Sequence, residues 1–143
     1  MSTEENKAVV RHWVEEDKKR NLAGVLELCA PDYVIHGTGG FPDMDLAGVK
    51  QLYTALFTAF PDAHSVLEDL IAEGDKVVAR FSMRGTHQGD FMGMPPTGKQ
   101  VSVTGIEIHR IEDDKFVESW ANSDALGMMQ QLGVIPQMAQ AGA

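Results

Sequence analysis

The chain has 143 residues, a length typical of one domain. Its hydrophobic content of 43% and its mixture of charges are those of a globular protein and exclude a disordered chain. The formal net charge of −9 disfavours nucleic acid or an anionic membrane surface as a partner. The single cysteine, Cys29, excludes an internal disulfide. Because no stretch has the apolar length of a signal peptide or a membrane span, we expect a cytoplasmic protein.

Helical periodicity dominates the first sixty residues. The spacing of apolar side chains predicts helices over residues 3–20, 22–28 and 49–60, with a brief strand over 33–36. Ser2 and Glu5 have the spacing of a capping box at the start of the first helix. Pro61 ends the third helix.

Past Pro61 the period of the apolar residues becomes two. This period predicts strands over 64–73, 76–87 and 99–112, then a strand that begins at Lys115. In the third of these strands the apolar phase shifts at Gly105, which predicts a β-bulge. Helical spacing returns from Ser123 to Gly133.

This order of elements predicts one α+β domain covering residues 1–143, with 137–143 as a frayed tail. Its strongly bent antiparallel sheet carries helices on the inner face and leaves a conical pocket. We expect the outer face to meet solvent or a second copy of the chain, giving a homodimer or homotetramer.

The corner between the last strand and the last helix carries the most distinctive polar groups. By alternation, Trp120, Asn122 and Asp124 share one strand face. A carboxylate beside an indole at such a corner could act as an acid/base on an apolar ligand. Asp124 could equally be a helix cap, because aspartate accepts hydrogen bonds from free N–H groups in a first turn.

Short motifs in the second half of the chain carry a family resemblance. They are GDFMGMPPTGK at residues 89–99, GIEIHRIED at 105–113, KFVESW at 115–120, and Asp124 followed by MQQLG at 129–133. Together they resemble the SnoaL-like polyketide cyclase family, most strongly from residue 85 to 133. The resemblance implies the α+β cone that this family shares with ketosteroid isomerase, scytalone dehydratase and limonene epoxide hydrolase. It also implies ring closure of a small apolar carbonyl compound by intramolecular aldol condensation, with no metal and no organic cofactor.

The resemblance further implies which residues form the site. Asp124 matches the acid/base aspartate of the family, and His36 and His109 match its pocket histidines. If the bulge at Gly105 is misplaced by one residue, Arg110 takes the position of His109. Ser119 departs from the family, which often has histidine there. The side chains expected to contact the substrate are Trp120, Asn122, Met92, Met94 and Phe57.

Other functions remain open for the same pocket. It could support isomerisation, dehydration or epoxide hydrolysis, or bind a small ligand without catalysis. A zinc site built from the histidines and Asp124 is disfavoured, because no closely spaced pair of ligands supports it. The position of Asp124 discriminates between these possibilities: an enzyme needs it inside the cavity, whereas a cap is exposed to solvent.

Overall fold

A computed structural model describes residues 1–37 and 42–136 of the chain. The chain begins with helices α1 (Thr3–Lys18) and α2 (Leu22–Glu27), followed by strands β1 (Cys29–His36) and β2 (Met44–Asp45) and helix α3 (Leu46–Ala59). Then follow β3 (His64–Glu73), β4 (Lys76–Thr86), β5 (Gln100–Glu112), β6 (Lys115–Ser123) and helix α4 (Ala125–Leu132). The expectation of a frayed tail over 137–143 lies outside the described residues.

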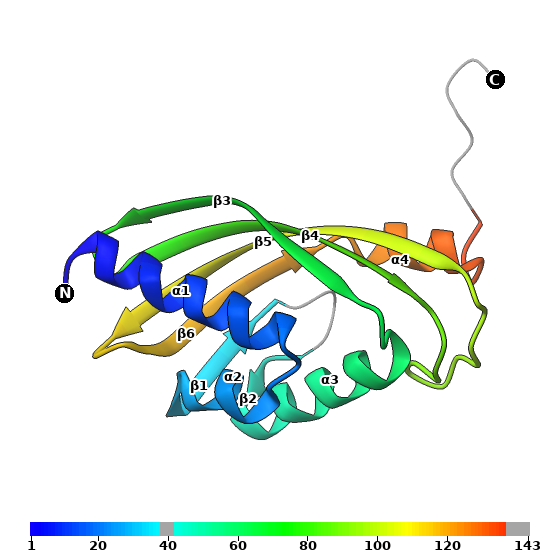
Figure 1. The fold of residues 1–143 in the computed structure, drawn as a ribbon, viewed down its shortest axis with the longest axis horizontal. Coiled ribbons are helices and arrows are strands. Elements are labelled where there is room, and N and C mark those ends of the chain that lie inside the picture. The colour runs from blue at the N-terminus through cyan, green and yellow to red at the C-terminus, as the bar shows by residue number, and fades with distance from the viewer. Residues whose placement is uncertain (38–41, 137–143) are drawn as a thin grey trace, which may run out of the picture.

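The six strands form one strongly curved sheet in the order β2-β1-β6-β5-β4-β3 (Figure 1). Neighbouring strands are antiparallel except β1 and β6, which are parallel. Helix α1 lies along one face of the sheet, and α2 and α3 lie below it (Figure 1). The α+β cone predicted from the order of helices and strands is therefore confirmed.

Local sequence signals set most of the element boundaries. The Ser2 side chain accepts a hydrogen bond from the Glu5 N–H, and the Glu5 side chain accepts one from the Ser2 N–H, so the predicted capping box is present. Gly133 ends α4 in the left-handed conformation at φ 80°, where glycine carries little strain. The strand predicted over 33–36 is longer, because β1 begins at Cys29.

Two adjacent rows of residues define the faces of the sheet. One row crosses β4, β5, β6 and β1 through register partners whose side chains belong to the inner face: Val77, His109, Ser119 and Ile35. One residue along, Val78, Ile108, Trp120 and His36 form the neighbouring row on the outer face. Because side chains alternate, His36 and His109 lie on opposite sides of the sheet.

The predicted bulge at Gly105 is wrong. Strands β4 and β5 pair without interruption from Lys76 opposite Arg110 to Thr86 opposite Gln100. A Cβ atom on Gly105 would lie 2.5 Å from Cζ of Phe81, so the glycine makes room for that ring. The register shift of β5 lies between Arg110 and Ile111, where it pairs with β6.

The inner face of the sheet carries the main hydrophobic core. Val10 of α1, Val49 of α3 and Val77 of β4 belong to one buried cluster there. A second cluster packs α4 against β5 through Met128, Leu132 and their neighbours. Among the helices described, none combines the length and the apolar character that crossing a membrane requires.

Candidate functional site

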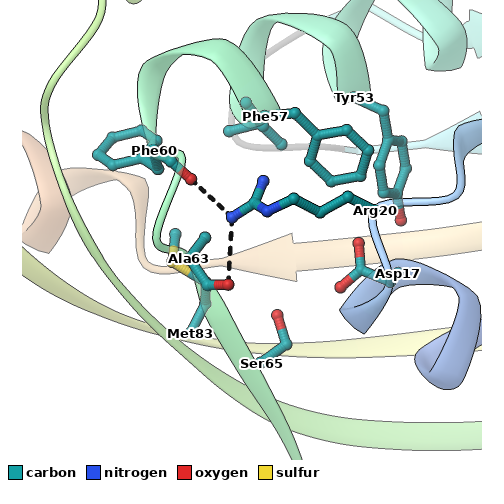
Figure 2. A pocket seen from close by; sticks show the side chains of 9 residues that line it. Asp17, Arg20, Tyr53, Phe57, Phe60, Ala63, Ser65 and Met83 are labelled. Carbon is teal, nitrogen blue, oxygen red and sulfur yellow. Dashed lines mark hydrogen bonds between the residues drawn. The ribbon is translucent and has the colours of Figure 1, made fainter.

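A cavity lies on the inner face of the sheet, between α1, α3 and strands β3 and β4 (Figure 2). Its volume is about 70 Å³, enough for a few water molecules. Its lining combines apolar and polar side chains: Asp17, Arg20, Tyr53, Leu56, Phe57, Phe60, Ala63, Ser65 and Met83. A concave, mostly apolar space with a few polar groups pointing into it is the usual form of a small-molecule site.

Asp17 is the carboxylate of this cavity. It lies on the stripe of α1 that faces the sheet, four residues after Trp13 and seven after Val10, so helical spacing turns it inward. Burial raises the pKa of Asp17, while the charge of Arg20 and the Ser65 hydroxyl partly offset the shift. A carboxyl group with a raised pKa can both take up and return a proton near neutral pH.

Tyr53 of α3 faces Asp17 across the cavity. Figure 2 shows its hydroxyl directed toward the Asp17 carboxylate. Burial, followed by the negative charge of Asp17, raises the pKa of Tyr53 well above its ordinary value of 10. The hydroxyl therefore stays protonated and can donate a hydrogen bond to a ligand oxygen.

Arg20 supplies the positive charge of the cavity. It follows α1 in the left-handed conformation, at φ 55°. Its Nη2 donates hydrogen bonds to the backbone oxygens of Phe60 at 2.9 Å and Ala63 at 3.2 Å. The guanidinium carbon lies 5.1 Å from the centre of the Phe57 ring, within cation–π range.

Arg110 points outward, whereas His109 is buried on the inner face of the sheet. Its Nδ1 lies in a hydrogen bond 2.6 Å from the Ser119 hydroxyl oxygen. Its Nε2 lies 3.1 Å from Glu107 Oε2, but the N–H is not aligned with that oxygen, and it has no hydrogen-bond partner among the described residues. His109 packs against the Trp13 ring rather than lining the cavity.

The prediction that Asp124 is sequestered beside Trp120 is wrong. Asp124 is exposed and caps α4, its side chain accepting a hydrogen bond from the Gly127 N–H at 2.9 Å. The physical reason is the phase of β6: Ser119 and Ala121 are the inward positions, so Trp120 and Asn122 fall on the outer face. The structure therefore does not bring Asp124 into the cavity or into contact with His109.

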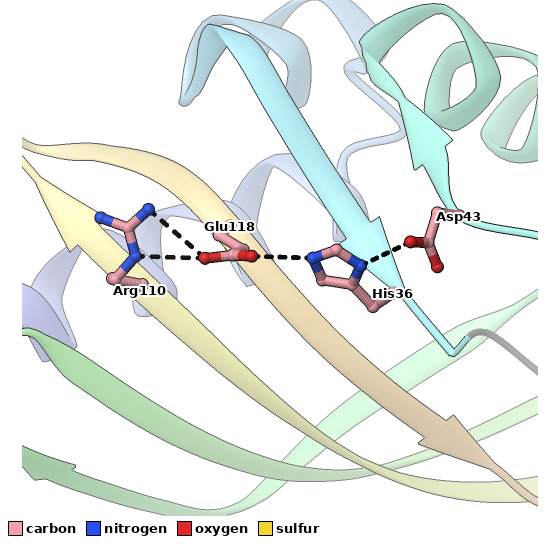
Figure 3. A network of polar contacts seen from close by, with 4 residues as sticks. All are labelled: His36, Asp43, Arg110 and Glu118. Atoms are coloured by element: carbon pink, nitrogen blue, oxygen red, sulfur yellow. Dashed lines mark hydrogen bonds and ion pairs between the residues drawn. The ribbon is translucent and has the colours of Figure 1, made fainter.

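His36 belongs to a polar network on the outer face instead (Figure 3). Its Nδ1 lies 2.7 Å from Asp43 Oδ2 and its Nε2 lies 2.8 Å from Glu118 Oε2. Hydrogen bonds to Asp43 and then Glu118 raise the pKa of His36. Its ring stacks on Trp120, with ring centres 5.7 Å apart. Glu118 in turn accepts hydrogen bonds from Arg110.

The remaining residues expected to bind substrate are dispersed. Phe57 lines the cavity, as expected. Asn122 and Met92 are exposed away from it, and Met94 packs against the second hydrophobic cluster. The predicted group of eight site residues therefore separates into an inner set, Phe57 and His109, and an outer or peripheral set.

The site residues predicted from the sequence include neither Asp17 nor Tyr53. The sequence does contain a sign that Asp17 faces inward. Asp17 continues the helical spacing of Val10, Trp13 and Val14, so a carboxylate lies within an otherwise apolar stripe. Tyr53 likewise lies within the apolar face of α3. An ionisable residue within an apolar helical stripe is a candidate functional residue.

Over residues 1–37 and 42–136, no three His, Cys, Asp or Glu side chains are arranged to hold a metal ion. The cavity is instead suited to proton transfer and to hydrogen bonding of a ligand oxygen. Its polar groups are Asp17, Tyr53, Arg20 and Ser65.

Structural comparison identifies similar proteins over nearly the whole chain. AclR from Streptomyces galilaeus, a candidate hydroxylase, is 31% identical with a TM-score of 0.88, over 97% of this chain and 87% of AclR. IdmH from Streptomyces antibioticus, a candidate polyketide cyclase, is 33% identical with a TM-score of 0.77, over 90% of this chain and 98% of IdmH.

Sequence comparison gives the same family. Aklanonic acid methyl ester cyclase DnrD from Streptomyces peucetius is 38% identical over 74 residues, which are 50% of this chain and 50% of DnrD. The match thus spans half the length of that cyclase. The profile of SnoaL-like polyketide cyclases matches residues 7–132. The chain therefore belongs to the SnoaL-like polyketide cyclase family.

Proposed function

We propose that the protein is a cofactor-free acid/base enzyme that closes a ring in a polyketide ester by intramolecular aldol condensation. The observation that carries this proposal is the pair of Asp17 and Tyr53 in a partly open, mostly apolar cavity. The similarity to DnrD and IdmH supports the same reaction. The substrate is an apolar compound with an activated carbon between two carbonyl groups.

The reaction needs one group to move one proton. The Asp17 carboxylate takes the proton from the carbon between the carbonyls, leaving an enolate and a neutral carboxylic acid. The enolate carbon attacks a ketone carbon of the same molecule, forming the new C–C bond as the C=O π bond becomes an alkoxide. The Asp17 carboxyl then returns its proton to the alkoxide, and the product is a cyclic β-hydroxy carbonyl compound with no net oxidation.

The raised pKa of Asp17 suits this cycle. An ordinary aspartate, with a pKa of 3.8, is a weak base, and burial makes it a stronger one. Because the carboxylate must be ionised to begin, we expect kcat/KM to rise with pH through the raised pKa of Asp17. The Tyr53 hydroxyl stays protonated over this range and can orient a substrate carbonyl.

A polycyclic substrate requires a larger space than 70 Å³. Phe57 and Met83 form opposite parts of the lining and are only partly buried. Both have rotatable side chains, so their movement would widen the cavity without unfolding the sheet.

The test measures exchange of the activated C–H protons of methyl acetoacetate into D₂O by NMR, followed by cyclisation of a polyketide methyl ester. We expect Asp17→Asn to lower the catalysed rate by about 10²-fold or more. Glu15→Gln, an exposed change on the same helix, is the control and should keep the parent rate. Undiminished exchange in a folded Asp17→Asn protein would reject the assignment, and loss of exchange in Asp124→Ala alone would return the acid/base role to Asp124.

A hydroxylase is the second candidate, because the likeness to AclR extends over 97% of the chain. Hydroxylation adds an oxygen atom from dioxygen to the product, whereas aldol closure conserves the mass of the substrate. Mass spectrometry of products formed under ¹⁸O₂ separates the two. Isomerase, dehydratase or hydrolase activity would use the same cavity and would be recognised by the product mass and structure.

Self-association through the outer face of the sheet is also part of the proposal. Ile106 and Ile108 are 50% and 36% exposed there, and Ile108 is the register partner of Trp120. Lys76 and Glu118 border this strip with opposite charges, so a second copy related by a two-fold axis could match it. Light scattering should report a dimer or tetramer for the parent and a smaller species for Ile106→Lys. A monomeric parent would reject this interface.

A further inference from the structure

The cavity and the second hydrophobic cluster are continuous. The residues that belong both to the cavity lining and to the cluster are Leu56, Phe60, Ala63 and Met83. In Figure 2, Phe60, Ala63 and Met83 lie at one end of the lining. Asp17 and Tyr53 lie at the other end. A ligand that places its polar atoms beside Asp17 and extends along the cavity therefore reaches the second cluster.

The second cluster lies on the same face of the sheet as the cavity. Met83 of β4 is the register partner of Val103 of β5, and Val103 is a buried member of the cluster. Another member, Phe91, packs edge-on against Phe60 with the ring centres 5.6 Å apart. An apolar layer therefore continues from the cavity to the space between β5, α4 and the loop that carries Phe91.

The side chains that fill the two hydrophobic clusters differ in mobility. In the main cluster Val10 and Val77 are fully buried, and branching at Cβ restricts their rotamers. In the second cluster three partly buried fillers are methionines: Met83, Met94 and Met129. Methionine is unbranched and flexible, and its thioether packs well against aromatic rings. The cavity can therefore enlarge more easily on the methionine side than on the valine side.

The size of the cavity indicates what the methionines make room for. Its volume of about 70 Å³ is well below the roughly 300–1,000 Å³ of ordinary small-molecule sites. The rings of Phe60 and Phe91 and the thioethers around them favour a flat aromatic group over a polar one. Because the three methionines keep some exposed surface, such a group can reach them.

We infer that the second hydrophobic cluster is a ring-binding subsite, in which an aromatic ring attached to the β-dicarbonyl group of a substrate displaces Met83 and Met94. This inference rests on the proposed function, because the dicarbonyl group is placed beside Asp17. Met94 lies in the loop between β4 and β5 and limits the size of the ring. Met92, in the same hairpin turn, is 55% exposed and takes no part.

The test labels the eight methionine methyl groups with ¹³C and follows them by NMR. The probe is ethyl 2-naphthoylacetate, a β-keto ester with a two-ring aromatic group. Ethyl acetoacetate is the matched probe without rings. Ring currents of the bound naphthalene should shift the methyl signals of Met83 and Met94 and leave the signal of Met92 in place. Ethyl acetoacetate should leave the signal of Met94 in place, and single Met→Leu variants assign the signals.

Shortening Met94 tests the size limit. Met94→Ala should bind ethyl 2-naphthoylacetate about tenfold more tightly than the parent, because the ring no longer displaces a packed side chain. Its affinity for ethyl acetoacetate should equal that of the parent. Met94→Leu conserves the side-chain volume and should bind both probes as the parent does. Met92→Ala, in the same turn, is the matched control and should leave both affinities unchanged.

Four results would overturn the inference. Two use the protein with Met94 in place: no binding of ethyl 2-naphthoylacetate, and binding that leaves the Met94 signal unshifted. They decide the question even if Met94→Ala does not fold. The other two are an unchanged affinity in folded Met94→Ala and equal tightening in Met92→Ala. The proposed function fails separately: proton exchange that survives Asp17→Asn rejects the base, whereas ring binding requires no catalysis.

Discussion

Replacing Asp124 separates a structural role from a catalytic one. Its side chain makes one cap hydrogen bond, to the Gly127 N–H at 2.9 Å, in an exposed setting. Loss of such a cap costs about 1 kcal/mol, in a range of about 0.5–2. For a domain of this size, we expect Asp124→Ala to lower Tm by about 2–4 °C and to leave the activity per folded molecule unchanged.

The chain offers a matched control for this change. Asp45 caps α3 in the same way, accepting a hydrogen bond from the Gly48 N–H at 2.9 Å, and is also exposed. Asp45→Ala should therefore cost a similar free energy of unfolding. Both variants are measured by thermal unfolding and by the exchange rate of methyl acetoacetate. A tenfold loss of exchange in Asp124→Ala, with Asp45→Ala unaffected and both proteins folded, would refute the assignment of Asp124 as a cap alone.

Three further predictions concern stability. The pKa of His36 is raised above 6.5 and the pKa of Glu118 is lowered below 4.5. The ion pair between them therefore stabilises the folded protein fully between pH 4.5 and pH 6.5. The difference in unfolding free energy between the parent and His36→Gln should shrink as pH rises through the raised pKa of His36. It should also shrink as pH falls through the lowered pKa of Glu118. A constant difference from pH 3 to about pH 9 would contradict this prediction. Asp114 lies at φ 61°, where glycine has no steric penalty but loses more conformational entropy, so Asp114→Gly should raise stability in urea by at most about 1 kcal/mol, and a loss would show that its side chain matters. A Cβ on Gly89 would lie 2.5 Å from a backbone oxygen of α3; Gly89→Ala should therefore lower Tm, and an unchanged Tm would show that the loop can shift.

The hairpin between β5 and β6 illustrates what local sequence can predict. Asp113 and Asp114 both adopt positive φ, at 50° and 61°, as a two-residue turn between twisted antiparallel strands requires. Aspartate tolerates this conformation better than most residues. Turn chemistry depends on adjacent residues, so it can be deduced from them.

The face of β6 illustrates what local sequence could not predict. Alternation placed Trp120 and Asn122 correctly on one side of the strand, but it could not say which side faced the helices. Asp124 lies past the end of the strand, as the N-cap of α4. Because Trp120 has a large apolar ring, the inner face of the sheet is the expected side for it. The register shift of β6 against β5 instead turns Ser119 and Ala121 inward, and the indole packs on His36 across the outer face. A single shift in register exchanges the two faces of a strand.

The sequence by itself determined the helices, the strands other than β2, the Ser2–Glu5 capping box and the family, because each depends on periodicity, turn residues or motifs close together along the chain. The tertiary structure decided which polar groups share a cavity. The cavity takes Asp17 from α1, Tyr53 from α3 and Arg20 from just after α1. These residues meet only when the helices pack on the curved sheet. Side-chain direction across a sheet is a long-range property, since it depends on pairing with strands distant in sequence.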